Sequence, residues 1–436
     1  MVALNFGLSV AALVSFVSAQ ATGGDFNILA FNVAGLPAIL NGNEVPGDKA
    51  TNAGTIGTLF TKYDYDIINM QEDFAFHSYI YATDKHPFRT PTSGTVVVGS
   101  GLNTISNFNW VDFRREKWDT CSNASGADCL TPKGFTFMRV AVSEGVYVDM
   151  YNLHTDAGTE SSDLTARAAN LKQVADYIDT WSSGNSVIVY GDTNSRYTRI
   201  PDKITVFRTQ NGMTDAFVEL MRGGVEPTVE TICTNPPTVR DCETVDKVFY
   251  RGSKQLSMTG TYFNYESSKF LQADGSILSD HNPITVNFTW SANPTRRQSP
   301  FFGGPHGTWF NDLEALPESP RATVITFRGG DRVDSVSLAL ASGQSFTHGG
   351  TGGTSRSLVL NSGEYWSSAR LCQGQKSGQT RIFSITATTS TGRTLSSGES
   401  TSDCVTYSTP AGWGIVGYLG QDGDEIDQLA FLYAPY

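Results

Sequence analysis

The residues best suited to chemistry in this chain lie in the stretch 187–195, which reads VIVYGDTNS. Its first four residues are apolar or aromatic and include two valines, which predicts a buried strand. Asp192 and Asn194 follow Gly191 at alternate positions, so their side chains point the same way on an extended backbone. A carboxylate and an amide at a strand end could handle a phosphate or a metal ion. Taken alone, the stretch favours a plain turn, because GD and DxN sequences end many strands.

Polar side chains also border several other apolar runs of the chain. They are Asn32 after FNILAF, Glu72 after DIINMQ, His154 and Asp156 after VYVDMYNL, Asp246 in TVDKVFY, and Asp280 and His281 before PITVNFTW. Each has an ordinary explanation by itself, as a turn residue, a helix cap or a solvated acid. Together they supply oxygen ligands for a cation and imidazoles that can exchange a proton near neutral pH. The combination favours a catalytic site.

Length and charge limit the kind of protein. The chain has 436 residues, which predicts two domains, and its formal net charge is −12. An acidic chain lacks the basic surface of a tight nucleic-acid binder, although a nuclease could still use a local site and a cation.

The N-terminal segment Met1–Ala19 contains the apolar run from Leu8 to Val17 and ends in small residues. This predicts a secretory signal peptide that is cut before Gln20. No later apolar run is long enough for a transmembrane segment. We therefore expect a secreted, extracellular protein.

Six cysteines in a secreted chain favour disulfides. Proximity in the sequence favours the pairs Cys121–Cys129, Cys233–Cys242 and Cys372–Cys404. Zinc binding is the rival interpretation, but the sequence lacks CxxC spacing and histidines near the cysteines. Asn123 and Asn287 each begin an Asn-X-Ser/Thr sequence and are predicted glycosylation acceptors in the same compartment.

Between Phe26 and Trp290, short apolar strands alternate with helical stretches. Strands are predicted at Asn27–Asn32, Ile67–Asn69, Gly94–Val98, Phe135–Val142, Tyr147–Leu153, Val187–Tyr190 and Ile284–Phe288, and helices at Ala50–Lys62 and Asp163–Trp181. The longer helix carries apolar residues at helical spacing, among them Leu171, Val174 and Ile178. The pattern predicts an α/β sandwich with mixed or antiparallel sheets and helices outside them.

The composition changes after residue 292. Residues 293–300 (NPTRRQSP) are polar, charged and proline-bearing, which predicts a linker between a domain at 20–292 and a domain at 301–436. The second segment is rich in Gly, Ser and Thr and has short alternating strands such as Thr323–Phe327 and Val333–Leu340. Because no helical pattern stands out there, an all-β domain is predicted.

The motifs AFN, MQED, NLHTD, GDTN, VDKVFY and SDHNPI occur in the order found in the endonuclease/exonuclease/phosphatase superfamily. The chain therefore resembles the superfamily of pancreatic-type deoxyribonucleases and neutral sphingomyelinases over roughly residues 26–290. The resemblance implies a four-layered α/β sandwich with two sheets flanked by helices. It also implies a phosphodiesterase that depends on Mg²⁺ or another divalent cation.

The same resemblance assigns roles to individual residues. It implies Glu72 as a ligand of the cation, with Asn32 beside it and Asp280 as an orienting or second ligand. It implies that Asp192 and Asn194 orient the phosphate and the attacking water.

Three further residues are expected to handle protons and charge. His281 is the expected general base, held by Asp246 in the right tautomer. His154 would stabilise the phosphorane or act as general acid. Members of the superfamily divide the base role differently, so Asp192 remains the rival of His281.

Weaker matches bear on the substrate. The segment GSGLNTIS at Gly99–Ser106 resembles the GSGL segment of neutral sphingomyelinases, and FNVAGLP resembles their NxxGxP start. Asp156 in HTD also favours the lipid-cleaving members. We expect a sphingomyelinase-like phospholipase C that cleaves a sphingophospholipid, which allows peripheral contact with a membrane. A nuclease acting on nucleic acid is the second interpretation, and a lectin with an inactive sandwich is the third.

Residues 300–436 resemble a jacalin-related lectin through FFGGPHGTWFND, HGGTGG, GEYW and GWGIVGYLGQDGDEIDQLAFLY. The resemblance implies a β-prism of three sheets that binds glycans. Its hexose site corresponds to the GxxxD loop Gly423–Asp427 and to Gly307. Asp427 would accept hydrogen bonds from two sugar hydroxyls, and the backbone amides of Asp424 and Glu425 would donate. These two acidic residues depart from the aromatic or small residues usual in the family, which leaves the sugar preference open.

Overall fold

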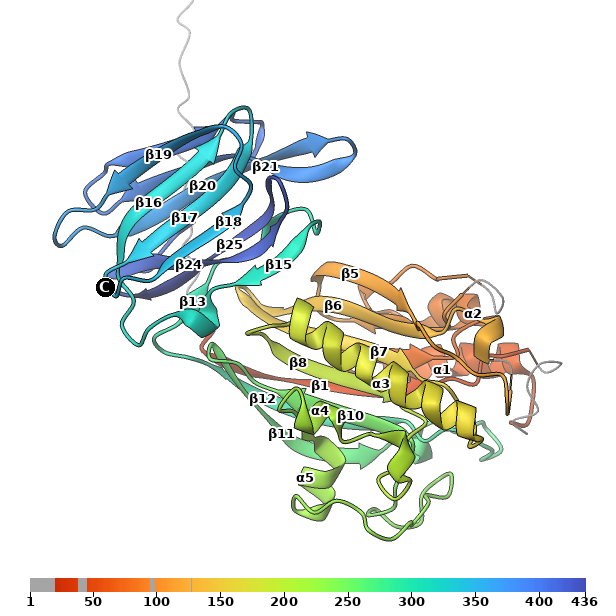
Figure 1. The fold of residues 1–436 in the computed structure, drawn as a ribbon. Helices are drawn as coiled ribbons and strands as arrows, with labels where there is room; N and C mark the ends of the chain where they lie inside the picture. The colour runs from red at the N-terminus through yellow and green to blue at the C-terminus, as the bar shows by residue number, and fades with distance from the viewer. Residues whose placement is uncertain (1–19, 38–44, 95–98, 127) are drawn as a thin grey trace, which may run out of the picture.

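The computed structural model describes residues 20–37, 45–94, 99–126 and 128–436. The predicted signal peptide Met1–Ala19 and most of the predicted strand Gly94–Val98 lie outside the described residues. Figure 1 shows a mixed α/β region, which ends with the strand at Ala292, and an all-β region above it. In the described part of the chain, no helix is long and apolar enough to cross a bilayer.

One six-stranded sheet of the α/β region has the order β11-β12-β1-β2-β4-β3. Its strands are β1 (Gly23–Asn32), β2 (Ile67–Gln71), β3 (Phe88–Arg89), β4 (Asn103–Ser106), β11 (Leu256–Tyr265) and β12 (Ile284–Ala292). β1 and β2 are parallel, whereas the other neighbours are antiparallel. The carboxyl ends of β1 and β2 therefore lie at the same edge of this sheet.

The other six-stranded sheet has the order β5-β6-β7-β8-β10-β9. Its strands are β5 (Trp110–Lys117), β6 (Gly134–Ser143), β7 (Val146–His154), β8 (Ser186–Asp192), β9 (Thr214–Asp215) and β10 (Asp246–Arg251). Here β7 and β8 are the parallel pair. The other neighbours are antiparallel. Both sheets are thus mixed, as the sequence predicts.

The two sheets share one buried core, to which β1 contributes Ile28 and β8 contributes Val189. Each aliphatic side chain that is fully buried in this way contributes about 1.5–3 kcal/mol to folding. The helices of the region are α1 (Lys49–Tyr63), α2 (His77–Thr83), α3 (Ser161–Trp181), α4 (Val206–Thr209) and α5 (Ala216–Arg222). Phe60 of α1 packs in a separate cluster with Phe31 of β1, so α1 covers the face of that sheet turned away from the shared core.

The all-β region consists of three sheets, ordered β13-β25-β24-β15 with β14 on β25, β18-β17-β16-β19, and β22-β21-β20-β23. The strands are β13 (Arg297–Gln298), β14 (Phe302–Gly303), β15 (Thr308–Asn311), β16 (Ala322–Gly329), β17 (Val333–Leu340), β18 (Ser345–Gly349), β19 (Thr354–Val359), β20 (Trp366–Lys376), β21 (Gln379–Thr389), β22 (Thr394–Gly398), β23 (Asp403–Ser408), β24 (Trp413–Asp422) and β25 (Ile426–Pro435). The rings of buried Trp366, Tyr418 and Phe431 pack at its centre in edge-to-face or tilted arrangements. Residues 301–436, all of them described, contain one short 3₁₀ turn as their only helical element. The all-β prediction is confirmed.

All three predicted disulfides are present. Cys121–Cys129 closes a loop before β6, and Cys233–Cys242 closes a loop before β10. Cys372–Cys404 joins paired residues of β20 and β23.

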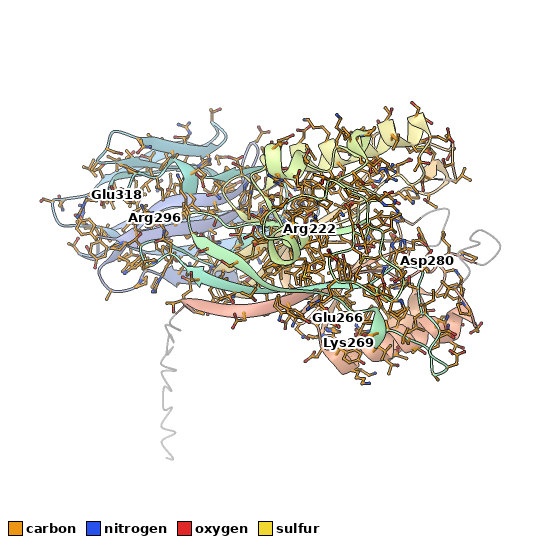
Figure 2. The ribbon with its side chains drawn as sticks, turned by 90° about the horizontal axis from the view of Figure 1, so that it is seen from below. Arg222, Glu266, Lys269, Asp280, Arg296 and Glu318 are labelled. Atoms are coloured by element: carbon orange, nitrogen blue, oxygen red, sulfur yellow. A yellow bond between two sulfur atoms is a disulfide. The ribbon has the colours of Figure 1, made fainter. Side chains whose placement is uncertain are left out.

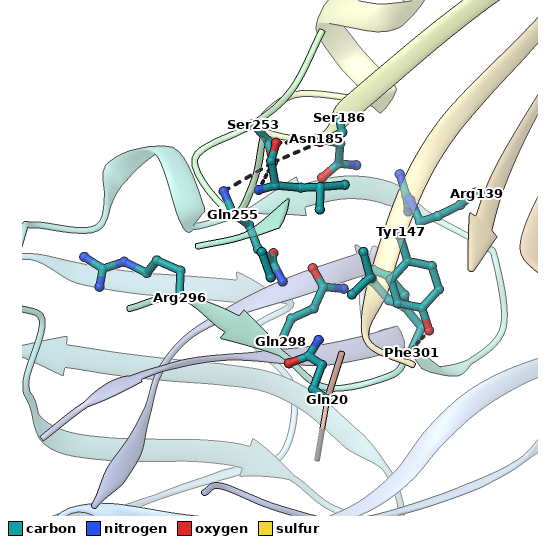
Figure 3. A pocket seen from close by; sticks show the side chains of 14 residues that line it. Gln20, Arg139, Tyr147, Asn185, Ser186, Ser253, Gln255, Arg296, Gln298 and Phe301 are labelled. Atoms are coloured by element: carbon teal, nitrogen blue, oxygen red, sulfur yellow. Dashed lines mark hydrogen bonds between the residues drawn. The ribbon is translucent and has the colours of Figure 1, made fainter. Parts of the chain in front are cut away.

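The segment 293–300, predicted as a linker, is packed against the all-β region. Arg297 and Gln298 form β13, which pairs with β25. The guanidinium of Arg296 donates to the carbonyls of Pro317 and Glu318, and Figure 2 shows Arg296 and Glu318 close together. Nearby, a small pocket lies between the two regions (Figure 3), with Tyr147 on one side and Gln298 on the other.

A polar contact joins the two regions beside this pocket. Arg139 of β6 is fully buried and forms an ion pair of 3.0 Å with Asp112 of β5. The ring of Trp309, from β15, lies 3.6 Å from the Arg139 guanidinium. Gln421 and Gln428 of the all-β region donate to Asp112 at 3.1 and 3.0 Å. The all-β region therefore completes the hydrogen bonding of a buried carboxylate in the α/β region.

Candidate active site

Strand register brings three of the predicted site residues into one row. His154 of β7 pairs with Asp192 of β8, and Asp192 pairs in turn with Asp246 of β10. The close approach of β8 to β7 requires Gly191, whose φ is +153° and whose missing Cβ would lie 2.5 Å from the Leu153 carbonyl oxygen. The row lies where the carboxyl ends of the parallel strands meet.

Asp192 is the centre of the row, and its side chain is nearly fully buried. Oδ1 accepts from the backbone amide of Asn194 at 2.9 Å. Oδ2 lies 3.2 Å from Asn32 Nδ2, 3.4 Å from His154 Nε2 and 3.7 Å from His281 Nε2. Burial favours the neutral acid, but the two histidines and these hydrogen bonds outweigh it and lower the pKa of Asp192. The carboxylate is therefore ionised at neutral pH.

His281 lies between two carboxylates. Its Nδ1 is 3.1 Å from Asp246 Oδ2, and its Nε2 faces Asp192. Burial opposes the charged imidazole, but Asp246 and Asp192 outweigh it and raise the pKa of His281 well above the usual value. The side-chain amide of Asn235, inside the loop closed by Cys233–Cys242, donates to the carbonyl of His281. That loop therefore helps to position the imidazole.

His154 is in a different electrostatic state. Its ring is buried, and Nε2 lies 3.3 Å from the ammonium of Lys133. Burial first, and then Lys133, lower the pKa of His154 to about 4, against the attraction of Asp192. At neutral pH the imidazole is therefore uncharged.

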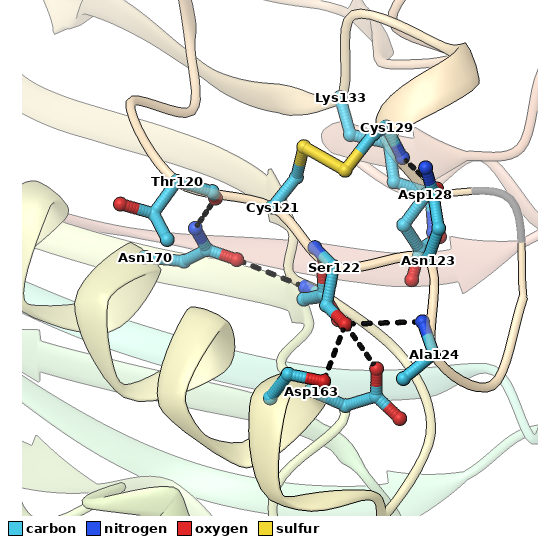
Figure 4. Close-up of a disulfide and its surroundings, with 12 residues drawn as sticks. Thr120, Cys121, Ser122, Asn123, Ala124, Asp128, Cys129, Lys133, Asp163 and Asn170 are labelled. Carbon is cyan, nitrogen blue, oxygen red and sulfur yellow. Dashed lines mark hydrogen bonds and ion pairs between the residues drawn. A yellow bond between two sulfur atoms is a disulfide. The ribbon is translucent and has the colours of Figure 1, made fainter.

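Lys133 is a site residue that the sequence analysis does not identify. It forms an ion pair with Asp128, next to the Cys121–Cys129 disulfide, as Figure 4 shows. Because β6 runs antiparallel to β7 and pairs Phe135 with Leu153, the residues before β6 lie beside the end of β7. A lysine directly before β6 could therefore be identified as a site residue only after β6 and β7 are known to pair in this register.

Asp156 and Asn194 hold neighbouring loops. Asp156 accepts from the backbone amide of Ser122 at 2.6 Å, inside the first disulfide loop, and burial raises its pKa to about 6. Asn194 has a φ of +46° and donates from Nδ2 to the carbonyl of Thr155 at 3.2 Å. Both side chains thereby fix the segment that follows His154.

The predicted metal ligands Asn32 and Glu72 lie together on the facing sheet. Asn32 Nδ2 donates to Glu72 Oε1 at 3.1 Å and also contacts Asp192. Glu72 Oε2 is buried without a hydrogen-bond partner, and burial raises the pKa of Glu72. An unpartnered buried carboxylate oxygen fits a divalent cation, which prefers oxygen ligands and would compensate the buried charge.

Two further features bear on cation binding. Asp280, the third predicted ligand, is exposed (Figure 2), and its charge raises the pKa of Glu72 from a distance. Asp192, Asp246 and His281 offer ligand atoms that lie within 4.8 Å of one another, so a second cation-binding arrangement is available beside the first.

The residues of the predicted hexose site also come together. Gly307 has a φ of +81°, and a Cβ there would lie 2.7 Å from Asp427 Oδ2, so only glycine allows this approach. Asp427 forms an ion pair with Arg381, and Glu425 binds Arg332 and Lys376. The carbonyl of Asp424 lies against Gly350. The sequence analysis does not identify the three cationic side chains.

Two family models match the chain. Residues 49–224 match the Endonuclease/Exonuclease/phosphatase family 2 model, and residues 299–432 match the Jacalin-like lectin domain model. The sphingomyelinases of Mycobacterium bovis and Mycobacterium tuberculosis are 35% identical over 277 residues, which cover 62% of this chain and 54% of theirs. The chain thus spans about half the length of the curated relatives it matches.

Solved structures of both kinds also resemble parts of the chain. AcmJRL, a mannose-binding jacalin-related lectin from Ananas comosus, is 23% identical and covers 32% of this chain and 97% of that one, with a TM-score of 0.29. D. rerio TDP2 complexed with a single-strand DNA product is 16% identical and covers 61% of this chain and 98% of that one, with a TM-score of 0.46. The two family matches thus place an endonuclease/exonuclease/phosphatase-like region at 49–224, followed by a jacalin-like lectin region at 299–432.

Proposed function

We propose that this protein is a secreted, divalent-cation-dependent phosphodiesterase with the four-layered sandwich of its superfamily. We further propose that it acts as a sphingomyelinase-like phospholipase C and that its lectin domain binds glycans. The observation that carries the proposal is the buried row of His154, Asp192 and Asp246, with His281 against Asp192. The identity to mycobacterial sphingomyelinases and the net charge of −12 favour a lipid substrate over nucleic acid.

Glu72 and Asn32 would hold Mg²⁺ or another divalent cation, with the charge of Asp280 nearby. When bound, the cation supplies neutralisation of the phosphate charge and stabilisation of the leaving oxygen. The unpartnered Oε2 of Glu72 supports this assignment, because it leaves one carboxylate oxygen available.

Of the two possible bases, His281 is the better placed. Asp246 binds Nδ1 and fixes the tautomer, so that Nε2 of the neutral imidazole faces the site and can accept a proton from the attacking water. Because the pKa of His281 is raised well above its usual value, this neutral form prevails only at alkaline pH, and the rate should rise with pH toward that pKa. The rival base, Asp192, has a lowered pKa and is therefore the weaker proton acceptor. Asp192 is instead suited to orient the water. As the water oxygen bonds to phosphorus and His281 takes its proton, the bond from phosphorus to the lipid oxygen breaks, and that oxygen leaves as an alcohol after it takes up a proton from solvent.

His154 and Lys133 are suited to stabilise the phosphate. An imidazole with a pKa of about 4 is uncharged at neutral pH and cannot supply the proton of a charged acid. It can still hydrogen-bond to a phosphate oxygen, and Lys133 beside it offers a full positive charge. Stabilisation of the phosphorane is therefore the better supported of the two roles expected for His154.

Secretion is supported by the three disulfides, which persist in oxidising compartments. The proposed glycosylation sites Asn123 and Asn287 are both exposed, as a glycan acceptor has to be.

The test is a hydrolysis assay on sphingomyelin, inositol phosphosphingolipid and plasmid DNA, each with Mg²⁺ or with EDTA. We expect lipid cleavage that EDTA abolishes and Mg²⁺ restores. Glu72→Gln should lower turnover by about 10²-fold or more, because it removes a carboxylate ligand. Glu219→Gln, at an exposed position of α5, is the matched control and should keep full activity.

Each alternative predicts a different result. Cleavage of DNA in preference to both lipids would favour the nuclease. If the folded protein binds a saccharide but hydrolyses none of the three substrates, the result would favour the inactive lectin. Full activity in EDTA would contradict the role of Glu72.

A further inference from the structure

The hexose loop of the lectin domain lies inside a cluster of charged side chains. The loop joins β24 to β25, and Glu425 and Asp427 in it are 7% and 1% exposed. Three cationic residues converge on it from other sheets: Arg332 before β17, and Lys376 and Arg381 on the β20–β21 hairpin.

The cations pair with the two carboxylates in different ways. Arg332 holds Glu425 with nitrogen–oxygen distances of 2.8–3.0 Å, and Lys376 reaches it at 2.6 Å. The hydrogen bond from Arg332 is the main reason why the pKa of Glu425 falls to about 2. Arg381 pairs with Asp427 and lies 3.6 Å from Glu425. The carboxylate expected to bind a sugar is thus already bound by a guanidinium.

This ion pair disfavours a neutral hexose. Sugar hydroxyls that donate to Asp427 have to compete with Arg381, whose side chain is only 20% exposed. Loss of one partner from a buried ion pair leaves an uncompensated charge, which is strongly unfavourable. A neutral hydroxyl brings no charge to replace the lost partner.

We propose that this site selects saccharides that carry an anionic substituent, and that Arg381 determines this specificity. The anionic group would take over the guanidinium in a charge-assisted hydrogen bond, and Asp427 would accept from the ring hydroxyls. Lys376 and Arg332, with 43% and 25% of their side chains exposed, offer further positive charge toward solvent. The inference rests on the carbohydrate binding proposed above and specifies its ligand class.

The test is calorimetric titration of the full chain with three probes: methyl α-mannoside, methyl glucuronide and a hexose 6-sulfate. We expect at least one anionic probe to bind about tenfold more tightly than the neutral one, and this difference should shrink with added salt. Methyl glucuronide carries a carboxylate and the hexose 6-sulfate carries a sulfate, so the two titrations show which anionic group the site prefers.

Two variants locate the effect. Arg381→Ala should abolish the preference and improve binding of methyl α-mannoside, because Asp427 is released. Lys376→Ala should weaken binding of the anionic probe several-fold. Its side chain is more exposed than that of Arg381, so the substitution disturbs folding less. Arg370→Ala, on the outer face of β20, is the control and should change neither affinity. Phosphodiester hydrolysis should be unchanged in all three variants, because the catalytic residues lie in the α/β region; thermal unfolding of each variant checks that the all-β region folds.

The outcomes separate this inference from the function on which it rests. Equal or tighter binding of the neutral probe, or an unchanged preference in Arg381→Ala, would overturn the specificity while carbohydrate binding stands. If none of the three probes binds, both proposals fail.

Discussion

Asp192 lies between two histidines, and its contacts distinguish their roles. Both imidazoles approach the same Oδ2, yet burial and Lys133 keep His154 uncharged, whereas Asp246 makes His281 a strong base. The two imidazoles therefore differ in pKa, because His154 has a cationic neighbour and His281 has a second carboxylate beside it. His281 is thus charged at neutral pH and can accept a proton only above its raised pKa, whereas His154 is neutral and can only hydrogen-bond.

We expect His281→Ala to lower turnover by about 10²–10⁴-fold, which is typical for loss of a positioned general base. Asp246→Asn should lower turnover less, because the imidazole remains but loses its charged partner. Steady-state kinetics on a lipid substrate measure both effects. Mg²⁺ titration should show that cation binding at Glu72 and Asn32 is close to that of the unmodified chain in both variants.

His306→Ala in the lectin domain serves as the control for this series and should have normal turnover. If His281→Ala turns over normally while Asp192→Asn is inactive, Asp192 is the base. His281 would then be a stabiliser of the transition state.

Some residues of the candidate active site can be predicted from the sequence, and others cannot. Asn32, Glu72, His154 and Asp192 each follow an apolar strand, and the ends of parallel strands meet at one edge, so their approach is predictable. Lys133 is not predictable in this way. It lies in a loop, and its place beside His154 depends on antiparallel pairing between β6 and β7.

At the scale of elements, two disulfide loops flank the cluster. The loop before β6 carries Asp128 and Lys133, and the loop before β10 binds the carbonyl of His281. Further hydrogen bonds fix the first loop, since Ala157 donates to Asp128 and Ser122 donates to Asp156. The first loop is thus tied both by a disulfide and through the carboxylates of Asp128 and Asp156.

Replacement of Cys121 and Cys129 by serine should reduce turnover through displacement of Lys133. We expect a loss of about 10²-fold, comparable to that of Lys133→Met, because one positioned charge stabilises the transition state by that order. The matched control is Cys372→Ser with Cys404→Ser, which removes the lectin-domain disulfide far along the chain. Kinetics of the three variants under identical conditions provide the measurement.

Full turnover in the Cys121/Cys129 variant would show that the hydrogen bonds alone hold Lys133. An equal loss in the lectin-domain control would point to general destabilisation instead.

The strands that sequence patterns miss are those without a continuous apolar run. β5 reads WVDFRREK, and its polar residues include Asp112, which pairs with Arg139 of its own domain and with two glutamines of the other. β11 alternates buried and exposed residues, with a register shift between Gly260 and Tyr262. The helices α1 and α3 are easier to predict, because each has an apolar face at helical spacing.

At the scale of the whole molecule, the two domains form one packed unit. Arg139 lies between Asp112 and Asp149 and against Trp309. Its positive charge pairs with the two carboxylates, and its flat guanidinium packs on the indole ring. No sequence pattern indicates this contact, because its residues belong to separate domains and become neighbours only after both have folded. The packing of 293–300 likewise depends on β25, near the end of the chain.

Arg139→Met should lower the free energy of unfolding by about 3–5 kcal/mol, because it leaves two buried carboxylates without their cation. Turnover at 25 °C should change little, since Asp149 lies toward the start of β7 whereas the active site lies at its end. Thermal unfolding and kinetics on the same sample provide the two readings. Arg356→Met, at an exposed position of β19, is the control and should melt like the unmodified chain. If Arg139→Met melts at the unmodified temperature, the ion pairs do not stabilise the fold, and the aromatic packing around Phe301 and Trp309 holds the domains together instead.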